Sequence, residues 1–140
     1  MNDLAPLDGL TVLEVSSFVA APLGGMTLAQ LGAQVIRIDP VGGGPDLGRW
    51  PLAPSGSSLY WTGLNKSKLS VTLNFRAPEG RQLLHDLVTA SGACGGIVLS
   101  GASWGVVWRG ERAVGQLDRC AWHGGVLLAC VGGPGSPAAG

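Results

Sequence analysis

The chain has 140 residues and a mass of 14.2 kDa, the size of one ordinary domain. Only 13% of its residues are charged and 46% are hydrophobic, which excludes the composition of a disordered chain. Nine basic side chains balance nine acidic ones, so a broad basic surface for nucleic acid is not expected. No apolar run reaches the roughly 18 residues of a membrane span, and the first residues lack the basic region of a signal peptide. We therefore expect a cytoplasmic chain without nucleic-acid or membrane partners.

The composition changes along the chain. Residues 1–100 contain both lysines, both methionines, both phenylalanines and the only tyrosine, whereas residues 101–140 contain ten glycines and three of the five tryptophans. We expect residues 1–100 to form one organised part and residues 101–140 an irregular tail, in which only Val126–Val131 forms a hydrophobic run. One interpretation of the tail is a change of reading frame between about residues 90 and 103. The other is a short paralogue with a genuine tail of its own.

The first half of the organised part predicts a strand, a helix and a strand. Thr11–Val15 is β-branched and apolar and follows Asp8-Gly9, which is typical of a strand. A helix is expected to start near Pro22 and to end at Gly32, with apolar positions at Leu23, Met26, Leu28 and Leu31. Gln34–Ile38 is the second expected strand. This order predicts a βαβ unit with parallel strands and a right-handed crossover.

The second half repeats the alternation after a long loop. Residues 40–58 are rich in proline and glycine and predict a loop, followed by a short helical turn at Ser58–Leu64. Strands are expected at Ser70–Asn74 and Gly96–Ser100. Between them, Pro78 and Glu79 open a helix with a predicted buried stripe of Leu83, Leu84, Leu87 and Val88. The expected fold is α/β, a partial Rossmann-like parallel sheet with an irregular C-terminal tail.

The segment after the first strand is the first candidate site. Open parallel sheets bind ligands beyond the carboxyl ends of their strands, which here corresponds to residues 16–25. Small residues in this segment permit close approach of a ligand, or simply close packing of helix and strand. Asp39 lies where dinucleotide-binding folds place a ribose-binding acid, but no G-x-G-x-x-G motif precedes it, so NAD is not expected.

Two lysines form the second candidate site. Lys66 and Lys68 stand just before a predicted strand and are the only lysines of the chain. Lysine is a good point-charge partner for phosphate, although a solvated charged turn explains the pair equally well. Arg37 and Arg49 are candidates for adding positive charge to the same edge of the sheet.

The other chemistry-bearing residues predict neither a metal site nor a hydrolase. His123 follows Cys120 by three residues, which is at best half of a zinc site. The three cysteines, at positions 94, 120 and 130, match no metal-ligand template. No serine stands in a G-x-S-x-G motif, and His85 lies on the polar side of its predicted helix.

Several motifs in order along the first 100 residues resemble the class III CoA-transferase family. They include the segments Leu7–Val15, Ala20–Pro22, Leu31–Pro40, Leu64–Ser70 and Pro78–Arg81. The string SSFVAAPLGGMTLAQ, with Gly42–Gly44 and the run Arg49–Pro51, is similar to the group that moves CoA between C1 and C4 of mesaconyl-CoA.

The resemblance implies a Rossmann-like large domain, an interlocked homodimer and transfer of CoA from an acyl thioester to a carboxylate. It implies that Phe18, Val19 and Ala20 line the CoA site. It also implies that Asn65 and Lys68 form the family's Asn-x-x-Lys motif, whose cation contacts the nucleotide phosphates. CoA and acyl-CoA are then substrates, and no prosthetic group is expected.

The family's nucleophile is an aspartate that attacks the thioester carbonyl. None of the aspartates of this chain, at positions 3, 8, 39, 46, 86 and 118, stands in the setting of that nucleophile. We therefore predict no catalytic residue and expect the chain to be inactive by itself. The alternatives are a non-catalytic CoA- or nucleotide-binding module and a gene remnant without function.

Overall fold

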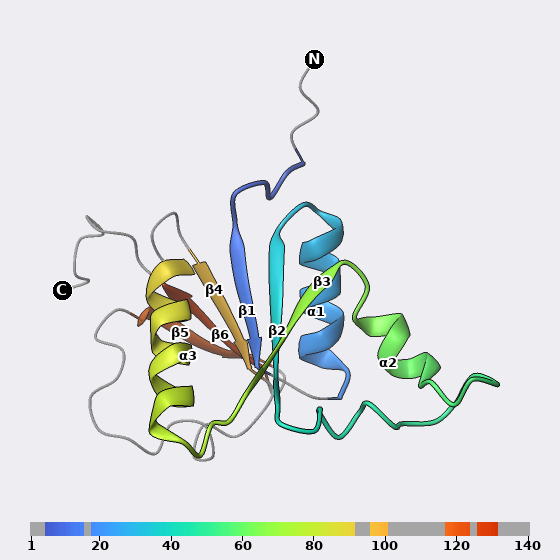
Figure 1. Ribbon diagram of the computed structural model, residues 1–140. Helices are drawn as coiled ribbons and strands as arrows, with labels where there is room; N and C mark the ends of the chain where they lie inside the picture. The colour runs from blue at the N-terminus through green and yellow to red at the C-terminus, as the bar shows by residue number, and fades with distance from the viewer. Residues whose placement is uncertain (1–4, 16–17, 92–95, 101–116, 124–125, 132–140) are drawn as a thin grey trace.

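The computed structural model describes residues 5–15, 18–91, 96–100, 117–123 and 126–131. Its core is a sheet of six strands in the order β3-β2-β1-β4-β6-β5 (Figure 1). Strands β1 (Thr11–Val15), β2 (Gln34–Pro40), β3 (Lys68–Leu73) and β4 (Gly96–Ser100) pair in parallel. The predicted parallel α/β sheet is thus confirmed, with β2 longer and β3 starting earlier than expected.

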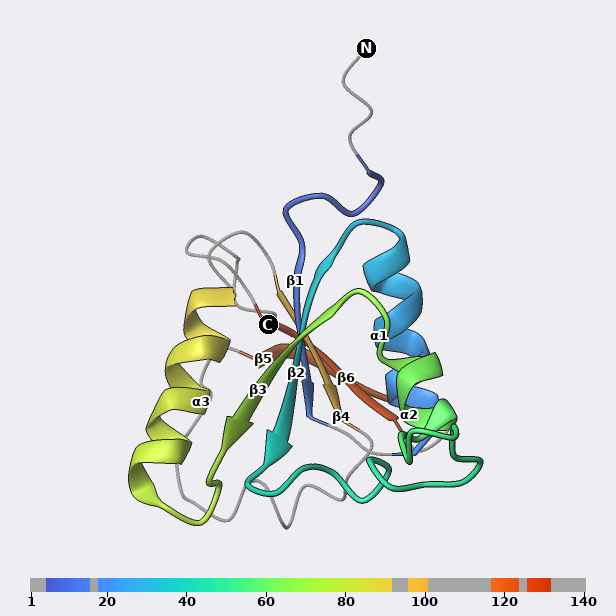
Figure 2. The ribbon, with the colours of Figure 1, turned by 45° about the vertical axis from the view of Figure 1, so that its right-hand side comes forward.

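Helices cover both faces of the parallel strands. The first crossover helix, α1 (Ala20–Gln30), lies on one face together with the short α2 (Leu59–Leu64), and α3 (Pro78–Ser91) lies on the other (Figure 2). At the end of α1, Gly32 adopts a left-handed φ of 104°, and its N–H donates to the carbonyl of Ala29 at 3.0 Å. The glycine thus ends the helix as predicted.

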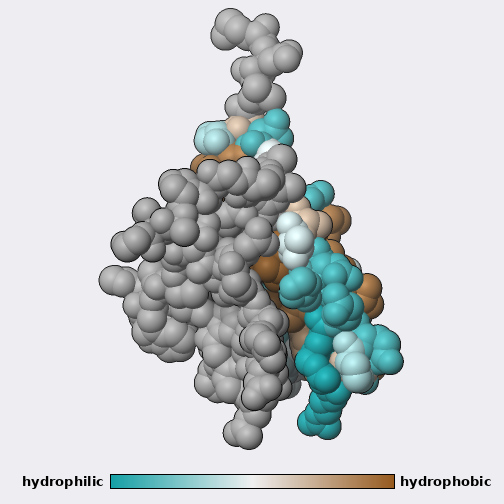
Figure 3. All heavy atoms as spheres, turned by 90° about the vertical axis from the view of Figure 1, so that its left-hand side faces the viewer, coloured by the Kyte–Doolittle hydropathy of each residue, from teal (hydrophilic) through white to brown (hydrophobic). Residues whose placement is uncertain are grey.

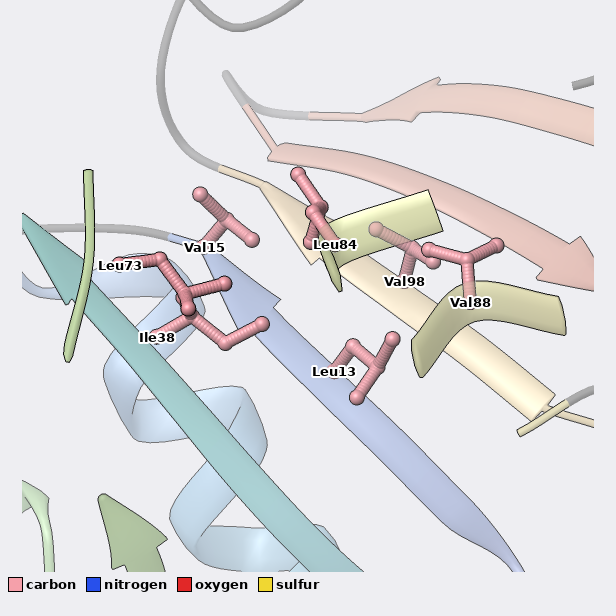
Figure 4. Close-up of a cluster of buried hydrophobic side chains, with 7 residues drawn as sticks. All are labelled: Leu13, Val15, Ile38, Leu73, Leu84, Val88 and Val98. Carbon is pink, nitrogen blue, oxygen red and sulfur yellow. The ribbon is translucent and has the colours of Figure 1, made fainter. Parts of the chain in front are cut away.

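Alternating strand residues divide the core into two layers. On the α3 side, Leu13 and Val98 pack with other buried side chains, among them Val15, Ile38, Leu73, Leu84 and Val88 (Figure 4). On the α1 side, Val12 and Val35 pack with Ala21, Ala33 and Leu99. Both layers meet at β1, which is buried at every residue from Val12 to Val15.

The buried stripe of α3 is narrower than predicted. Leu84 and Val88 are buried, but Leu83 is 53% exposed. Successive helix residues are rotated by about 100°, so the side chain before Leu84 points away from the sheet. Figure 3 looks onto the side of the molecule that carries α3, where the coloured residues are mostly hydrophilic. His85 of α3 is exposed, as predicted.

The described part of the tail adds two strands to the sheet. Strand β6 (Val126–Val131) pairs antiparallel with β4, and β5 (Leu117–His123) pairs antiparallel with β6. The hydrophobic run of Val126–Val131 is visible in the sequence, whereas β5 carries no comparable run. A strand can form without such a pattern because its pairing uses main-chain groups.

No helix of the described ranges is long and apolar enough to span a membrane.

Adjacent leucines of α3 provide a test of the packing. We expect Leu84→Ala to lower the free energy of unfolding by about 2–5 kcal/mol, because it leaves a cavity against the sheet. Leu83→Ala removes the same atoms from an exposed position and should cost less than about 0.5 kcal/mol. Urea denaturation of both variants measures the difference. Equal costs would contradict the arrangement of α3 on the sheet.

Candidate functional site

The first candidate surface lies at the carboxyl edge of the sheet, where the chain leaves β1 for α1. The chain runs from β1 to β2 on one side and returns through α3 to β4 on the other, which makes this edge the switch point of the topology. Phe18, Val19 and Ala20 are all exposed here, and Phe18 has 60% of its surface accessible. The three residues that the family resemblance implies for the CoA site are therefore all accessible at this edge.

Phe18 has an unusual backbone for a large side chain. Its φ is 71°, in the left-handed region that few non-glycine residues adopt. Such a conformation costs on the order of 1–3 kcal/mol and persists only where neighbouring structure enforces it. It presents the phenyl ring at the edge of the sheet beside the loop of residues 40–58.

Arg49 of that loop lies over two aromatic rings. Its Cζ is 5.1 Å from the ring centroid of Phe18 and 4.7 Å from that of Tyr60. Both separations fall within the range of a cation–π interaction. Arg49 thus joins the exposed end of the β1–α1 connection to α2.

Behind this surface, Arg37 holds two carboxylates in the interior. Its guanidinium donates to both carboxylate oxygens of Asp39, with the shortest contact at 3.0 Å, and to Asp46 at 2.8 Å. All three residues are buried, Arg37 to 99%. Asp46 lies in the loop of residues 40–58, so this contact fixes the loop against the end of β2. Asp39 is engaged here as an ion-pair partner.

A second cation, Lys68, continues the same network. Its Nζ donates to Glu14 at 2.7 Å, to the carbonyl of Pro22 at 2.8 Å and to Asn65 Oδ1 at 3.0 Å. The same Asn65 oxygen accepts from Arg37 at 2.9 Å. The Asn65 amide therefore links the two cations. Through Lys68 and Arg37, the network as a whole joins β1, β2, β3, α1 and the end of α2.

Burial changes the proton affinity of both cations. Desolvation lowers the pKa of Lys68, and the hydrogen bond to Glu14 offsets only part of that effect. Desolvation also acts on Arg37, but hydrogen bonds and charge attraction from Asp39 and Asp46 outweigh it and raise the pKa of Arg37. Arg37 therefore remains charged, and its two carboxylates are compensated.

Two glycines permit the close packing around this network. A β-carbon at Gly25 of α1 would overlap the Oε2 atom of Glu14. A β-carbon at Gly44 would lie 2.7 Å from Asp46 Oδ1 and 2.8 Å from Asp39 Oδ1. The helix and the loop thus approach the buried carboxylates more closely than a side chain would allow.

The predicted basic residues fall into two groups. One group lies in the interior network and consists of Arg37 and Lys68, with Asn65 between them. Arg49 lies on the surface instead. Lys66 is exposed. The sequence prediction missed Glu14 and Asp46. Glu14 gave a signal, because a carboxylate in the apolar strand TVLEV requires a buried partner.

No group of three or more metal-ligating side chains occurs within the described residues. His123 and Cys120 lie in β5, of which only the backbone is described. Cys94 lies outside the described residues.

Comparison with known proteins identifies the family. Residues 7–107 match the model of CoA-transferase family III. The chain belongs to CoA-transferase family III. Over 95 residues it is 56% identical to the 2-methylfumaryl-CoA isomerase of Chloroflexus aurantiacus, a match that covers 67% of this chain and 23% of that enzyme. Over 84 residues it is 40% identical to the succinyl-CoA–D-citramalate CoA-transferase of the same organism, which covers 59% of this chain and 21% of that enzyme.

A solved structure of the family shares the fold. The CAIB/BAIF family protein from Brucella suis superposes with a TM-score of 0.60 at 31% sequence identity, which covers 75% of this chain and 30% of that protein. The resemblance drawn from the sequence motifs is thereby confirmed. The chain spans between a fifth and a third of the length of these family members.

Neighbouring glycines of α1 test the close approach to Glu14 in this family member. We expect Gly25→Ala to lower the free energy of unfolding by about 1–3 kcal/mol, because the new methyl group displaces a buried, paired carboxylate. Gly24→Ala meets nothing within 4 Å and should raise stability by about 0.5–1 kcal/mol through better helix propensity. Urea denaturation of the two variants gives the comparison. A stabilising Gly25→Ala would contradict the described packing.

Proposed function

We propose that this chain supplies the CoA-binding part of a class III CoA-transferase. The intact enzyme would move CoA between an acyl thioester and a carboxylate, and the mesaconyl-CoA C1–C4 transfer is the reaction we favour. The observation that carries the proposal is the surface of Phe18, Val19 and Ala20 at the carboxyl edge of the sheet. It lies at the switch point, and the sequence that forms it falls within the family match.

We propose different roles for the surface residues and for the buried ones. Phe18 and Val19 would contact CoA directly, because both are exposed. Lys68 donates to the carbonyl of Pro22 in the first turn of α1, and it shares Asn65 with Arg37. Asn65 and Lys68 would therefore serve CoA binding by fixing the start of α1 and the end of α2, with their charge and amide already satisfied inside the protein.

We further propose that this chain binds CoA without transferring it. Transfer requires a carboxylate nucleophile that attacks the thioester carbonyl. Asp39 and Asp46 are buried and paired with Arg37, so neither is free to attack a ligand at the surface. Asp8 precedes β1 at the amino edge of the sheet and Asp86 lies in α3, so both of these exposed aspartates lie away from the Phe18 surface. This pairing favours a CoA-binding module as the role of the chain by itself. The mesaconyl-CoA transfer reaction and the interlocked dimer would then belong to the intact enzyme.

Titration with CoA by isothermal calorimetry tests the proposal. We expect saturable binding by the 140-residue chain and about tenfold weaker binding by Phe18→Ala, because an aromatic contact with a base is worth about 1–3 kcal/mol. Leu83→Ala is the matched control, since Leu83 is similarly exposed on the opposite face of the sheet. It should bind CoA like the unaltered chain.

A rise in melting temperature with CoA should accompany the heat signal, because a ligand that binds only the folded state stabilises it. A cooperative melt with neither heat nor a shift in melting temperature would contradict CoA binding. An equal loss in Phe18→Ala and Leu83→Ala would contradict the proposed location.

A further inference from the structure

Arg49 is a fixed cation whose hydrogen-bonding capacity is unused. Its guanidinium lies over the rings of Phe18 and Tyr60, and its side chain is exposed. Within the described ranges, its side-chain N–H groups have no hydrogen-bond acceptor and no ion-pair partner. Arginine presents five N–H donors in a rigid plane. Because the side chain is exposed and these donors are unused, they are accessible to a ligand from solvent.

The backbone of Arg49 is held by its neighbours. Its N–H donates to the carbonyl of Asp46 at 3.2 Å, and its own carbonyl accepts from the Ser58 hydroxyl. Ser58 also caps α2 by accepting from the N–H of Trp61 at 3.0 Å. The Asp46 side chain is in turn bound to Arg37. Arg49 is therefore pre-positioned, and less conformational entropy is lost when it binds an anion.

The surroundings of Arg49 favour a single carboxylate on a short carbon chain. The other cations near this edge, Arg37 and Lys68, are buried with carboxylate partners. Two exposed apolar side chains stand near Arg49 in the sequence: Leu47 is 46% exposed and Trp50 is 77% exposed. A planar guanidinium matches a carboxylate with two parallel hydrogen bonds. A polyphosphate would call for several available cations at the same place.

We propose that Arg49 binds the free carboxylate of a dicarboxylic acyl-CoA and so makes this chain prefer thioesters that carry a second carboxyl group. The proposal rests on the proposed function, because it places the acyl part of the ligand beside the CoA surface of Phe18. It assigns the substrate class to one residue of the loop of residues 40–58.

Two thioesters with the same number of acyl carbons test the proposal. Succinyl-CoA carries a terminal carboxylate, and butyryl-CoA does not. We expect the chain to bind succinyl-CoA at least tenfold more tightly than butyryl-CoA by calorimetry. In Arg49→Gln this ratio should fall to about one, while the Kd for butyryl-CoA stays within about twofold. Arg76→Gln, which removes an equal charge from an exposed position just before α3, should keep the full ratio.

An equal loss of affinity for both thioesters in Arg49→Gln would overturn the proposal, because Arg49 would then serve the CoA part or the fold. A ratio near one in the unaltered chain would overturn it as well. If neither thioester binds, the proposed function fails, and the Arg49 site is tested with succinate against inorganic phosphate. A saturable change of the Arg49 Nε–Hε NMR signal with succinate alone would support it. No change, or a change with phosphate only, would overturn it.

Discussion

The buried ion pairs of Glu14, Arg37 and Lys68 are the constraint on which the rest of the structure depends. Removing charges from water is costly, and each buried charge must keep its partners in place. Lys68 holds Glu14 of β1 and the start of α1, while Arg37 holds Asp39 of β2 and the loop through Asp46. Because Asn65 binds both cations, the sheet edge, the loop and both helices of one face are positioned together.

The cations of this edge therefore have two different roles: two of them support the site from inside the protein, and one is available to a ligand. Arg37 and Lys68 have their charges compensated inside the protein, whereas Arg49 lies at the surface over two rings. Helix α2 contacts both kinds of cation. The Cζ atom of Arg37 lies 5.9 Å from the ring centroid of Trp61, and that of Arg49 lies 4.7 Å from the ring centroid of Tyr60. The proposed CoA surface around Phe18 and the proposed carboxylate site at Arg49 are thus two parts of one supported edge.

Periodicity predicted the parallel strands and the helices, because local pattern and turn residues decide them. Periodicity wrongly placed Leu83 in the buried stripe of α3. Leu83 stands next to buried Leu84 in the sequence, but its side chain is exposed because it points away from the sheet. The pairing of partners in the ion network could not be predicted, because Glu14 and Lys68 are 54 residues apart in the sequence. They meet only because the fold brings β1 and β3 into the same sheet. Direct contact of Lys68 with phosphate, which the family resemblance implies, stays a prediction. Family motifs, by contrast, identified the family correctly.

A double-mutant cycle between Glu14→Gln and Lys68→Met tests the central role of the network most directly. Each single variant leaves a buried charge with fewer partners and should lower the free energy of unfolding by about 3 kcal/mol. The double variant removes both charges, so its loss should be smaller than the sum by at least about 1 kcal/mol. Additive losses, or single losses below about 0.5 kcal/mol, would contradict the account.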